Sequence, residues 1–154
     1  MELCVARSME DELFFSCVKD LLDHPEIQKL EDYFQHSRTT RLKHSLNVAY
    51  YSFKAARFLG WDHRSAARGA MLHDLFHYER KEAPISALRH LRVHPRMALE
   101  NAERNFFLNE KERDIILKHM WLCTLKPPKY RESFLVSFVD KFCAVMETFC
   151  AGVI

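Results

Sequence analysis

The chain has 154 residues, of which 48% are hydrophobic, and this composition excludes an intrinsically disordered protein. Its net charge of +2 provides no basic field for a nucleic-acid polymer or an anionic membrane. No run of about twenty apolar residues could span a bilayer, and the opening MELCVARSMEDE has acidic residues where a secretion signal has an apolar stretch. Five cysteines without a CxxC pair indicate reduced thiols. We therefore expect a cytoplasmic protein.

Apolar residues recur at helical spacing along most of the chain, and only three glycines interrupt the pattern. This spacing predicts a helix over 10–23, and Pro25 suits the start of a second helix that runs toward residue 34. After a loop, HSRTT, a long helix is predicted over 41–59. Its two apolar stripes indicate a central position in a bundle, and Gly60 suits its C-terminal cap.

The second half of the chain continues with shorter helices. A helix over 62–78, capped by Asp62, is rich in small residues that permit the close approach of a neighbouring helix. Four more helices are predicted, over 84–93, 95–106, 109–120 and 131–149. No stretch has the alternation of a β-strand. The sequence therefore predicts an all-α fold: a single-domain bundle of about seven or eight helices over 1–154, with residues 1–23 as an N-terminal helix packed on it.

Six polar residues occupy positions where the helical pattern calls for apolar ones: His44, His73, Asp74, His94, His119 and Asp140. Each alone has an ordinary explanation, because a single histidine between helices is commonly a hydrogen-bonded core residue, and the six could simply satisfy one another. In order, however, they come from five predicted helices, and helix bundles assemble metal sites from facing helices in this way. Four imidazoles and two carboxylates suit divalent metals and exceed the needs of one zinc ion.

The order of these residues resembles the HD superfamily of metal-dependent phosphohydrolases, whose pattern is a His, a later His-Asp pair and a later Asp. The matching stretches are TTRLKHSLNVAYYS with His44, GAMLHDLF with His73 and Asp74, and SFVDKFCA with Asp140. The resemblance covers about residues 24–149. It implies an HD-type helical domain in which these four residues hold one metal ion.

Two further histidines match the binuclear branch of that superfamily: His94 in VHPRMALENA and His119 in IILKHMW. The resemblance implies that they hold a second ion, with Asp74 bridging the two. His90, one helical turn before His94, is an alternative ligand. The implied cofactors are two divalent ions, iron or manganese in the first place, with zinc, magnesium, cobalt or nickel as alternatives.

One position departs from the pattern of many relatives, which continue the His-Asp pair as HDxxK. Here His77 replaces the lysine. An imidazole can still donate a hydrogen bond or move a proton near neutral pH, but the fixed positive charge is lost. The GYP motif of the cyclic-di-GMP enzymes is absent as well. The substrates of those relatives are therefore not carried over.

The first functional hypothesis is hydrolysis of a phosphoester in a nucleotide or another small phosphorylated metabolite. Two ions about 3.5–4 Å apart would activate a water as hydroxide for attack on phosphorus. Asp74 would bridge the ions and accept a proton, and His77 would donate to the leaving group or bind phosphate. Candidates for binding the substrate phosphate are His36, Arg38, Arg41 and Lys141. A homodimer is compatible with the sequence, and no nucleic-acid polymer or membrane is expected as a partner.

Two alternatives stay open. The same six-residue arrangement resembles the diiron oxygenases of this superfamily, which use a mixed-valence iron pair to activate oxygen. A non-catalytic domain that binds or senses a nucleotide is the other alternative, although a degenerate relative would usually have lost some of the ligands. Oxygen uptake by iron-loaded protein, compared with phosphate release, separates the first two hypotheses.

Overall fold

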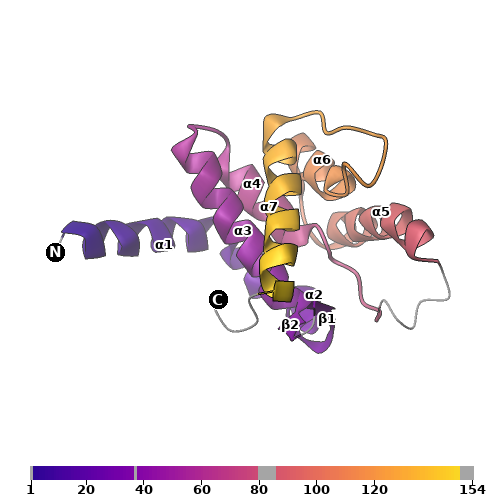
Figure 1. Cartoon of the computed structure of the whole chain (residues 1–154). Helices are drawn as coiled ribbons and strands as arrows, with labels where there is room; N and C mark the ends of the chain where they lie inside the picture. The colour runs from indigo at the N-terminus through magenta and orange to yellow at the C-terminus, as the bar shows by residue number, and fades with distance from the viewer. Residues whose placement is uncertain (1, 37, 80–85, 150–154) are drawn as a thin grey trace.

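The computed structural model describes residues 2–36, 38–79 and 86–149, with the side chains of residues 2–8 and 36 excepted. This part of the chain contains seven α-helices (Figure 1): α1 (Glu2–Leu22), α2 (Pro25–Gln28), α3 (Arg41–Phe58), α4 (His63–Leu72), α5 (Ala87–Asn105), α6 (Glu110–Lys118) and α7 (Arg131–Phe149). A 3-10 turn, η1 (Lys29–Asp32), and a two-stranded antiparallel hairpin of β1 (Phe34–His36) and β2 (Thr39–Thr40) complete the elements. The all-α prediction is confirmed.

Most helices begin at a side chain that caps their first turn. Thr40, Asp62 and Ser86 accept hydrogen bonds from backbone N–H groups of α3, α4 and α5, respectively. Asn109 and Glu112 form a reciprocal capping box at the start of α6. At the other end of α3, Gly60 has φ +67°, a left-handed conformation that favours glycine, and its predicted capping role is confirmed.

The helix α3 lies in the middle of the fold, with α4 and α7 packed along it (Figure 1). The helix α4 in turn contacts α1 and α6, and α5 packs on α6. The apolar side chains buried between them form one continuous cluster that includes residues of α1, such as Val18 and Leu21. Among the described helices, none has a stretch apolar and long enough to traverse a bilayer.

The small residues predicted to permit close approach do so in α4. A Cβ atom built on Gly69 would lie 2.8 Å from three side-chain atoms of Ile115 in α6. Because glycine has no side chain at this point, α4 and α6 pack closely. Both helices end beside the cluster of polar residues described below, so this contact helps to place two of its members.

Several predictions about the elements are wrong, including the second helix, which ends at Gln28 instead of running toward residue 34. The helix predicted to run to residue 78 ends at Leu72, and the helices predicted on either side of Pro95 are one helix, α5. The proline removes one hydrogen bond, to the carbonyl of Leu91, but the helix continues because Ala98 and Ala102 beyond it are buried in the core. A short hairpin replaces the expected loop, so the expectation that no strand would form is wrong too.

Candidate metal centre

The structure brings the six predicted residues together, and all of them are buried. His44 lies in the first turn of α3, His94 in the middle of α5, and Asp140 in the middle of α7. The other three follow helix ends. His73 and His119 are the C-cap residues of α4 and α6, and Asp74 comes directly after His73. Five helices therefore contribute to one cluster, although three of its members lie just beyond the helices that position them.

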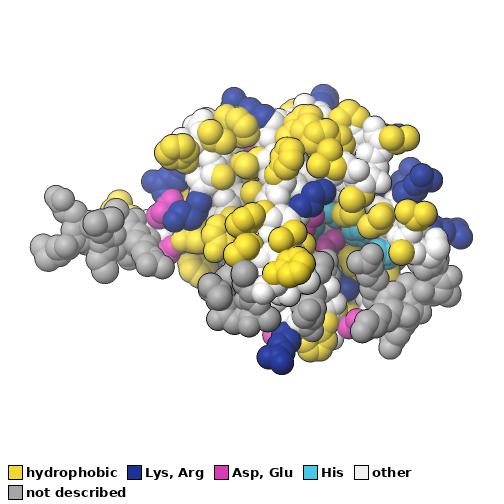
Figure 2. Space-filling model, viewed as in Figure 1, with side chains coloured by type: hydrophobic (Ala, Val, Ile, Leu, Met, Phe, Trp, Pro, Cys, Tyr) yellow, Lys and Arg dark blue, Asp and Glu magenta, His cyan; other side chains and the backbone are white. Residues whose placement is uncertain are grey.

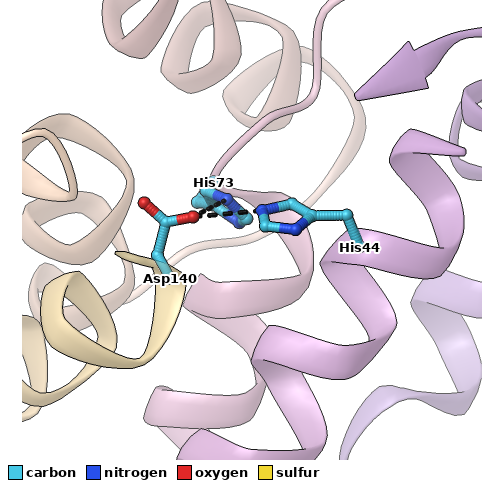
Figure 3. A group of neighbouring side chains, drawn as sticks. All are labelled: His44, His73 and Asp140. Carbon is cyan, nitrogen blue, oxygen red and sulfur yellow. Dashed lines mark hydrogen bonds and ion pairs between the residues drawn. The ribbon is translucent and has the colours of Figure 1, made fainter. Parts of the chain in front are cut away.

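His44, His73 and Asp140 form the first of two groups of potential metal ligands, and Figure 3 shows the three side chains pointing toward one another. The Nε2 atom of His44 lies 3.0 Å from Asp140 Oδ1. The Nε2 atom of His73 lies 3.4 Å from the same oxygen. One atom of each residue is thus within 4.8 Å of the others, which leaves room for a divalent ion between them.

The second group lies beside the first and shares His73 with it: His73, Asp74 and His119. Asp74 Oδ1 faces Nε2 of His94 at 3.4 Å and Nε2 of His119 at 3.5 Å. Its other oxygen, Oδ2, faces Nε2 of His73 at 3.4 Å. The two oxygens of Asp74 are therefore turned toward different imidazoles, Oδ1 toward His94 and His119 and Oδ2 toward His73.

Hydrogen bonds to the backbone determine which ring nitrogen is protonated in three of the histidines. The Nδ1 atoms of His73, His94 and His119 lie 2.6–2.8 Å from the carbonyl oxygens of Ala70, His90 and Ile116. A carbonyl oxygen only accepts, so each Nδ1 must carry the hydrogen and donate. In a neutral ring this leaves Nε2 with a free lone pair, and all three Nε2 atoms point into the cluster. This is the usual arrangement of histidines that ligate a metal.

Two observations show that the cluster fits a cation. Within the described part of the chain, His73 Nε2 and Asp74 Oδ1 are buried without a hydrogen-bond partner, and such atoms are costly to bury. In addition, the Nε2 atoms of His94 and His119 are 2.9 Å apart. Two lone pairs at that distance repel each other unless a cation or a proton lies between them.

The charge and burial of the cluster indicate whether a proton or a metal ion lies between these two nitrogen atoms. Burial lowers the pKa of His94, and burial together with the nearby His73 lowers the pKa of His119 to about 3. Neither ring therefore takes up a proton readily. Burial alone would raise the pKa of Asp74, but His73, His94 and His119 lower it, so the carboxylate is ionised. His94 and His119 thus offer lone pairs, and Asp74 offers negative charge, to a metal ion.

Two residues that the sequence analysis did not single out support the ligands. Glu147 in α7 lies 2.8 Å from His44 Nδ1 through its Oε2, and its Oε1 accepts from Asn47 at 3.0 Å. Gln35 in β1 donates from Nε2 to Asp74 Oδ2. A signal for Glu147 is present in the sequence: it follows Asp140 by seven residues, two helical turns, and therefore lies on the same face. No such signal marks Gln35.

Arg41 and Lys141 line a cavity of about 160 Å³ that opens beside Asp74, His94 and His119. Arg41 is buried and stacks over the ring of Phe76 at 3.8 Å. It donates to Gln35 Oε1 and to the carbonyls of Phe76 and Tyr78. Lys141 donates to the carbonyls of His119 and Ser137 and to the Ser137 hydroxyl. Both residues thus place positive charge at the cavity wall.

Three of the remaining candidates for the site lie away from the six-residue cluster or outside the described residues. His77 is partly exposed, and its Nε2 lies 3.0 Å from the backbone oxygen of Glu26 in α2, away from the six-residue cluster. Arg38 is exposed in the turn of the hairpin. The side chain of His36 lies outside the described residues.

His90, the alternative to His94, lines the cavity, and Tyr78 OH lies 3.1 Å from its Nδ1. The roles of these residues remain predictions.

A comparison with protein-family models identifies the family of the chain. The family model of the HD domain matches residues 41–145, which include all six clustered residues. No curated protein and no solved structure matches the chain. The family match covers about two thirds of the chain and includes all or part of each helix that supplies the cluster. The chain therefore belongs to the HD-domain family, a family of metal-dependent phosphohydrolases.

Proposed function

We propose that the chain hydrolyses a phosphoester with the help of two divalent metal ions. The observation that carries this proposal is the orientation of Asp74, whose two oxygens face two different sets of imidazoles at 3.4–3.5 Å. His44, His73 and Asp140 would hold one ion, and His94 and His119 the other, with Asp74 between them. When bound, two such ions polarise phosphoryl oxygens and lower the pKa of a coordinated water.

The residues of the chain give the cavity a charge that suits a phosphate ester. Of the five N–H groups of Arg41, three are used in bonds to Gln35, Phe76 and Tyr78, so two are left for an anion. Lys141 uses its three N–H groups within the protein and contributes charge rather than a free donor. Arg41 would bind the phosphate directly, and Lys141 would attract it. Asp74 is the proposed proton acceptor.

The cavity of about 160 Å³ is large enough for the phosphoryl end of a substrate but not for a complete nucleotide. A larger groove of about 640 Å³ adjoins it, and Leu91 lines both. Four cations border the groove: Arg92, Arg96, Lys118 and Lys126. We infer that the rest of the substrate lies along this groove. Iron and manganese remain the proposed metals, since imidazoles and carboxylates suit both.

The test is a panel of phosphate esters of different size, including nucleoside monophosphates, given to protein loaded with Mn²⁺ or Fe²⁺. We expect phosphate release by the wild type and by D23N, which changes an exposed aspartate outside the site. We expect D74N to lose this activity with its helical circular dichroism unchanged. Elemental analysis should find two ions per chain, and one ion would exclude the role of His94 and His119.

Two outcomes would contradict the proposal. Oxygen consumption by iron-loaded protein in the absence of any phosphate release would favour the diiron oxygenases. Nucleotide binding without turnover, by protein that holds two ions, would favour a sensing domain. The chain retains every polar group of the cluster, which is why hydrolysis is preferred to the sensing function.

A further inference from the structure

The outer surface of α7 is almost free of charge. The exposed residues of this helix are Arg131, Phe138, Phe142, Val145, Thr148 and Phe149. Three of the six are phenylalanines, and their exposed fractions are 54% for Phe138, 58% for Phe142 and 81% for Phe149. In Figure 2, which views the molecule from the side of α7, hydrophobic side chains gather over this helix. Surface helices usually carry charged residues on their solvent face, so this face is exceptional.

The spacing of the apolar residues on this face is that of a helix–helix contact. Phe138, Phe142, Val145 and Phe149 follow one another at steps of four, three and four residues. Apolar residues at these steps form a straight seam along one side of a helix, as they do in coiled coils. Asp140 and Glu147 lie on the opposite, buried side, where they contact His44. One helix thus serves the metal centre on its inner side and presents an apolar seam on its outer side.

A hollow lies directly beside this seam, between α3 and α7. It has a volume of about 480 Å³ and is lined by Tyr51, Lys54, Ala55, Phe138, Val139 and Phe142. Among the described residues that line it, only Lys54 is charged. Its ammonium lies 3.5 Å from the Glu10 carboxylate and 5.5 Å from the Tyr50 ring centroid. A neighbouring molecule placed here would therefore meet an apolar ridge and an apolar recess, with the adjoining positive charge already offset.

We propose that this face binds a second copy of the chain, so that the protein is a homodimer with α7 at its interface. A symmetric dimer uses the same patch of both partners, and such a patch must be complementary to itself. The seam and the hollow meet this requirement, because the seam of one copy can enter the hollow of the other. The absence of exposed acidic residues on α7 removes the like-charge repulsion that two identical surfaces could otherwise cause.

The apolar face supplies a large part of the area that a stable contact needs. With exposed fractions of 38–81%, the four seam residues and Tyr51 together present on the order of 500 Å² of apolar side chain. The rest of the hollow and the neighbouring Thr148 add to this area. A stable interface takes about 800 Å² from each partner. The residues of α7 that line the cavity at the metal centre are Asp140, Lys141 and Ala144, and none of them belongs to the seam, so the proposed interface and the cavity use different residues of this helix.

The test is the mass of the whole chain in solution, measured by sedimentation velocity between about 1 and 100 μM. We expect the wild type to be a dimer within this range. The variant F142E should raise the dissociation constant about 30-fold or more, because a charge would be buried in the centre of the interface. The matched control is F107E, which alters a fully exposed phenylalanine outside α7 and should remain dimeric.

Circular dichroism would verify that both variants are folded. A wild-type protein that stays monomeric at 100 μM would overturn the proposal. Equal dissociation constants for F142E and the wild type would overturn it as well, since the dimer would then use another surface. A monomer that binds phosphatidylcholine vesicles through Phe142 would show that the face contacts lipid instead. None of these measurements depends on phosphate release. The proposed dimer is therefore tested independently of the proposed reaction.

Discussion

Each histidine of the cluster is held by a second contact that orients its ring. Three of them use a carbonyl oxygen of their own helix, three or four residues earlier. His44 alone uses a side chain, the carboxylate of Glu147. Burial lowers the pKa of His44, but Asp140 and Glu147 outweigh this effect and raise it to about 10. Glu147 therefore fixes the orientation of one proposed ligand and adds negative charge behind it.

Replacing Glu147 tests this role at the scale of one residue. We expect E147A to weaken metal binding about 10- to 100-fold, the usual cost of losing a contact behind a ligating histidine. E147Q keeps an oxygen that can accept from His44 but loses the charge, so its loss should be smaller. Competition against a chelating dye measures the affinity. E12A, which removes an exposed glutamate from α1, is the control; equal affinities for E12A and E147A would contradict the role.

The sequence predicted the six clustered residues but not Glu147 and Gln35, the residues that contact them. The six clustered residues stand out because each is polar at an otherwise apolar position and because their order matches the family. Glu147 was not singled out, although its spacing from Asp140 carries the same information. Gln35 could not have been found, because its position depends on a short hairpin that the hydrophobic pattern does not reveal. His77 takes Glu26 as its partner through a tertiary contact that the sequence does not encode locally.

The contact between α4 and α6 shows how one element positions another. Gly69 lies against Ile115, and an added methyl group would be 2.8 Å from three of its atoms. Alanine favours a helix over glycine by about 1 kcal/mol, but overpacking a core costs about 1–3 kcal/mol. Because Ile115 is fully buried, we expect G69A to lower the free energy of unfolding by up to about 2 kcal/mol in urea titrations, the net of these two effects.

A double variant separates this clash from other effects. I115V removes Cδ1, one of the three Ile115 atoms that the new methyl group would meet, and so relieves part of the clash. If the clash is the cause, the loss caused by G69A should be smaller in the I115V background than in the wild type. Additive losses would contradict the explanation. His73 and His119 terminate these two helices, so the same variants should also weaken metal binding.

Glu132 connects three elements at the other end of α4. It is buried, and its Oε1 accepts from the Asp62 backbone and from Lys111 Nζ, each at 3.1 Å. Burial alone would raise the pKa of Glu132, but these bonds and its own backbone N–H lower it below the ordinary 4.5. The folded state then binds fewer protons than the unfolded state near that pH. The stabilisation is therefore complete above about pH 5 and is lost as the pH falls through the folded-state pKa.

Unfolding experiments at several pH values test this contribution. At pH 7 we expect E132Q to lose about 1–3 kcal/mol, since a buried charged acceptor is removed from its donors. Between pH 5 and pH 3 the difference between E132Q and the wild type should shrink, because the wild-type carboxylate becomes protonated. E100Q, at an exposed position of α5, should follow the wild type at every pH. A difference for E132Q that does not depend on pH would contradict the assignment.

The limits of prediction at the scale of elements have physical causes. The helices over 41–58, 110–118 and 131–149 were predicted almost to the residue, because their apolar periodicity and capping residues agree. Pro95 misled the prediction, since a proline is common at a helix start and rare inside a helix. The end of α4 was misplaced because the apolar residues continue beyond it: Leu75 and Phe76 are buried, but they lie in irregular backbone after the helix.

For the molecule as a whole, the metal centre joins helices that are distant in the sequence. His44 and Asp140 are 96 residues apart, yet their side chains meet at 3.0 Å. Without a cation, the cluster buries two carboxylates, an unpartnered imidazole nitrogen and two opposed lone pairs. Each of these opposes folding, and the unfolded chain does not hold these groups together. A metal ion that binds only the folded state must therefore stabilise the whole fold.

Thermal unfolding of the metal-free and metal-loaded protein measures this stabilisation. At a free metal concentration about 1,000 times the dissociation constant, binding of one ion contributes about 4 kcal/mol. For a chain of this length, 1 kcal/mol corresponds to about 2–4 °C, so we expect Mn²⁺ to raise Tm by about 10 °C and excess EDTA to reverse the rise. D74A should abolish most of the shift, because Asp74 faces His94 and His119 as well as His73, which belongs to both groups of ligands. D23A should keep it. A Tm that is the same with Mn²⁺ and with EDTA would mean that the six residues pair with one another rather than with a metal. The proposed reaction would then have no cofactor at this site.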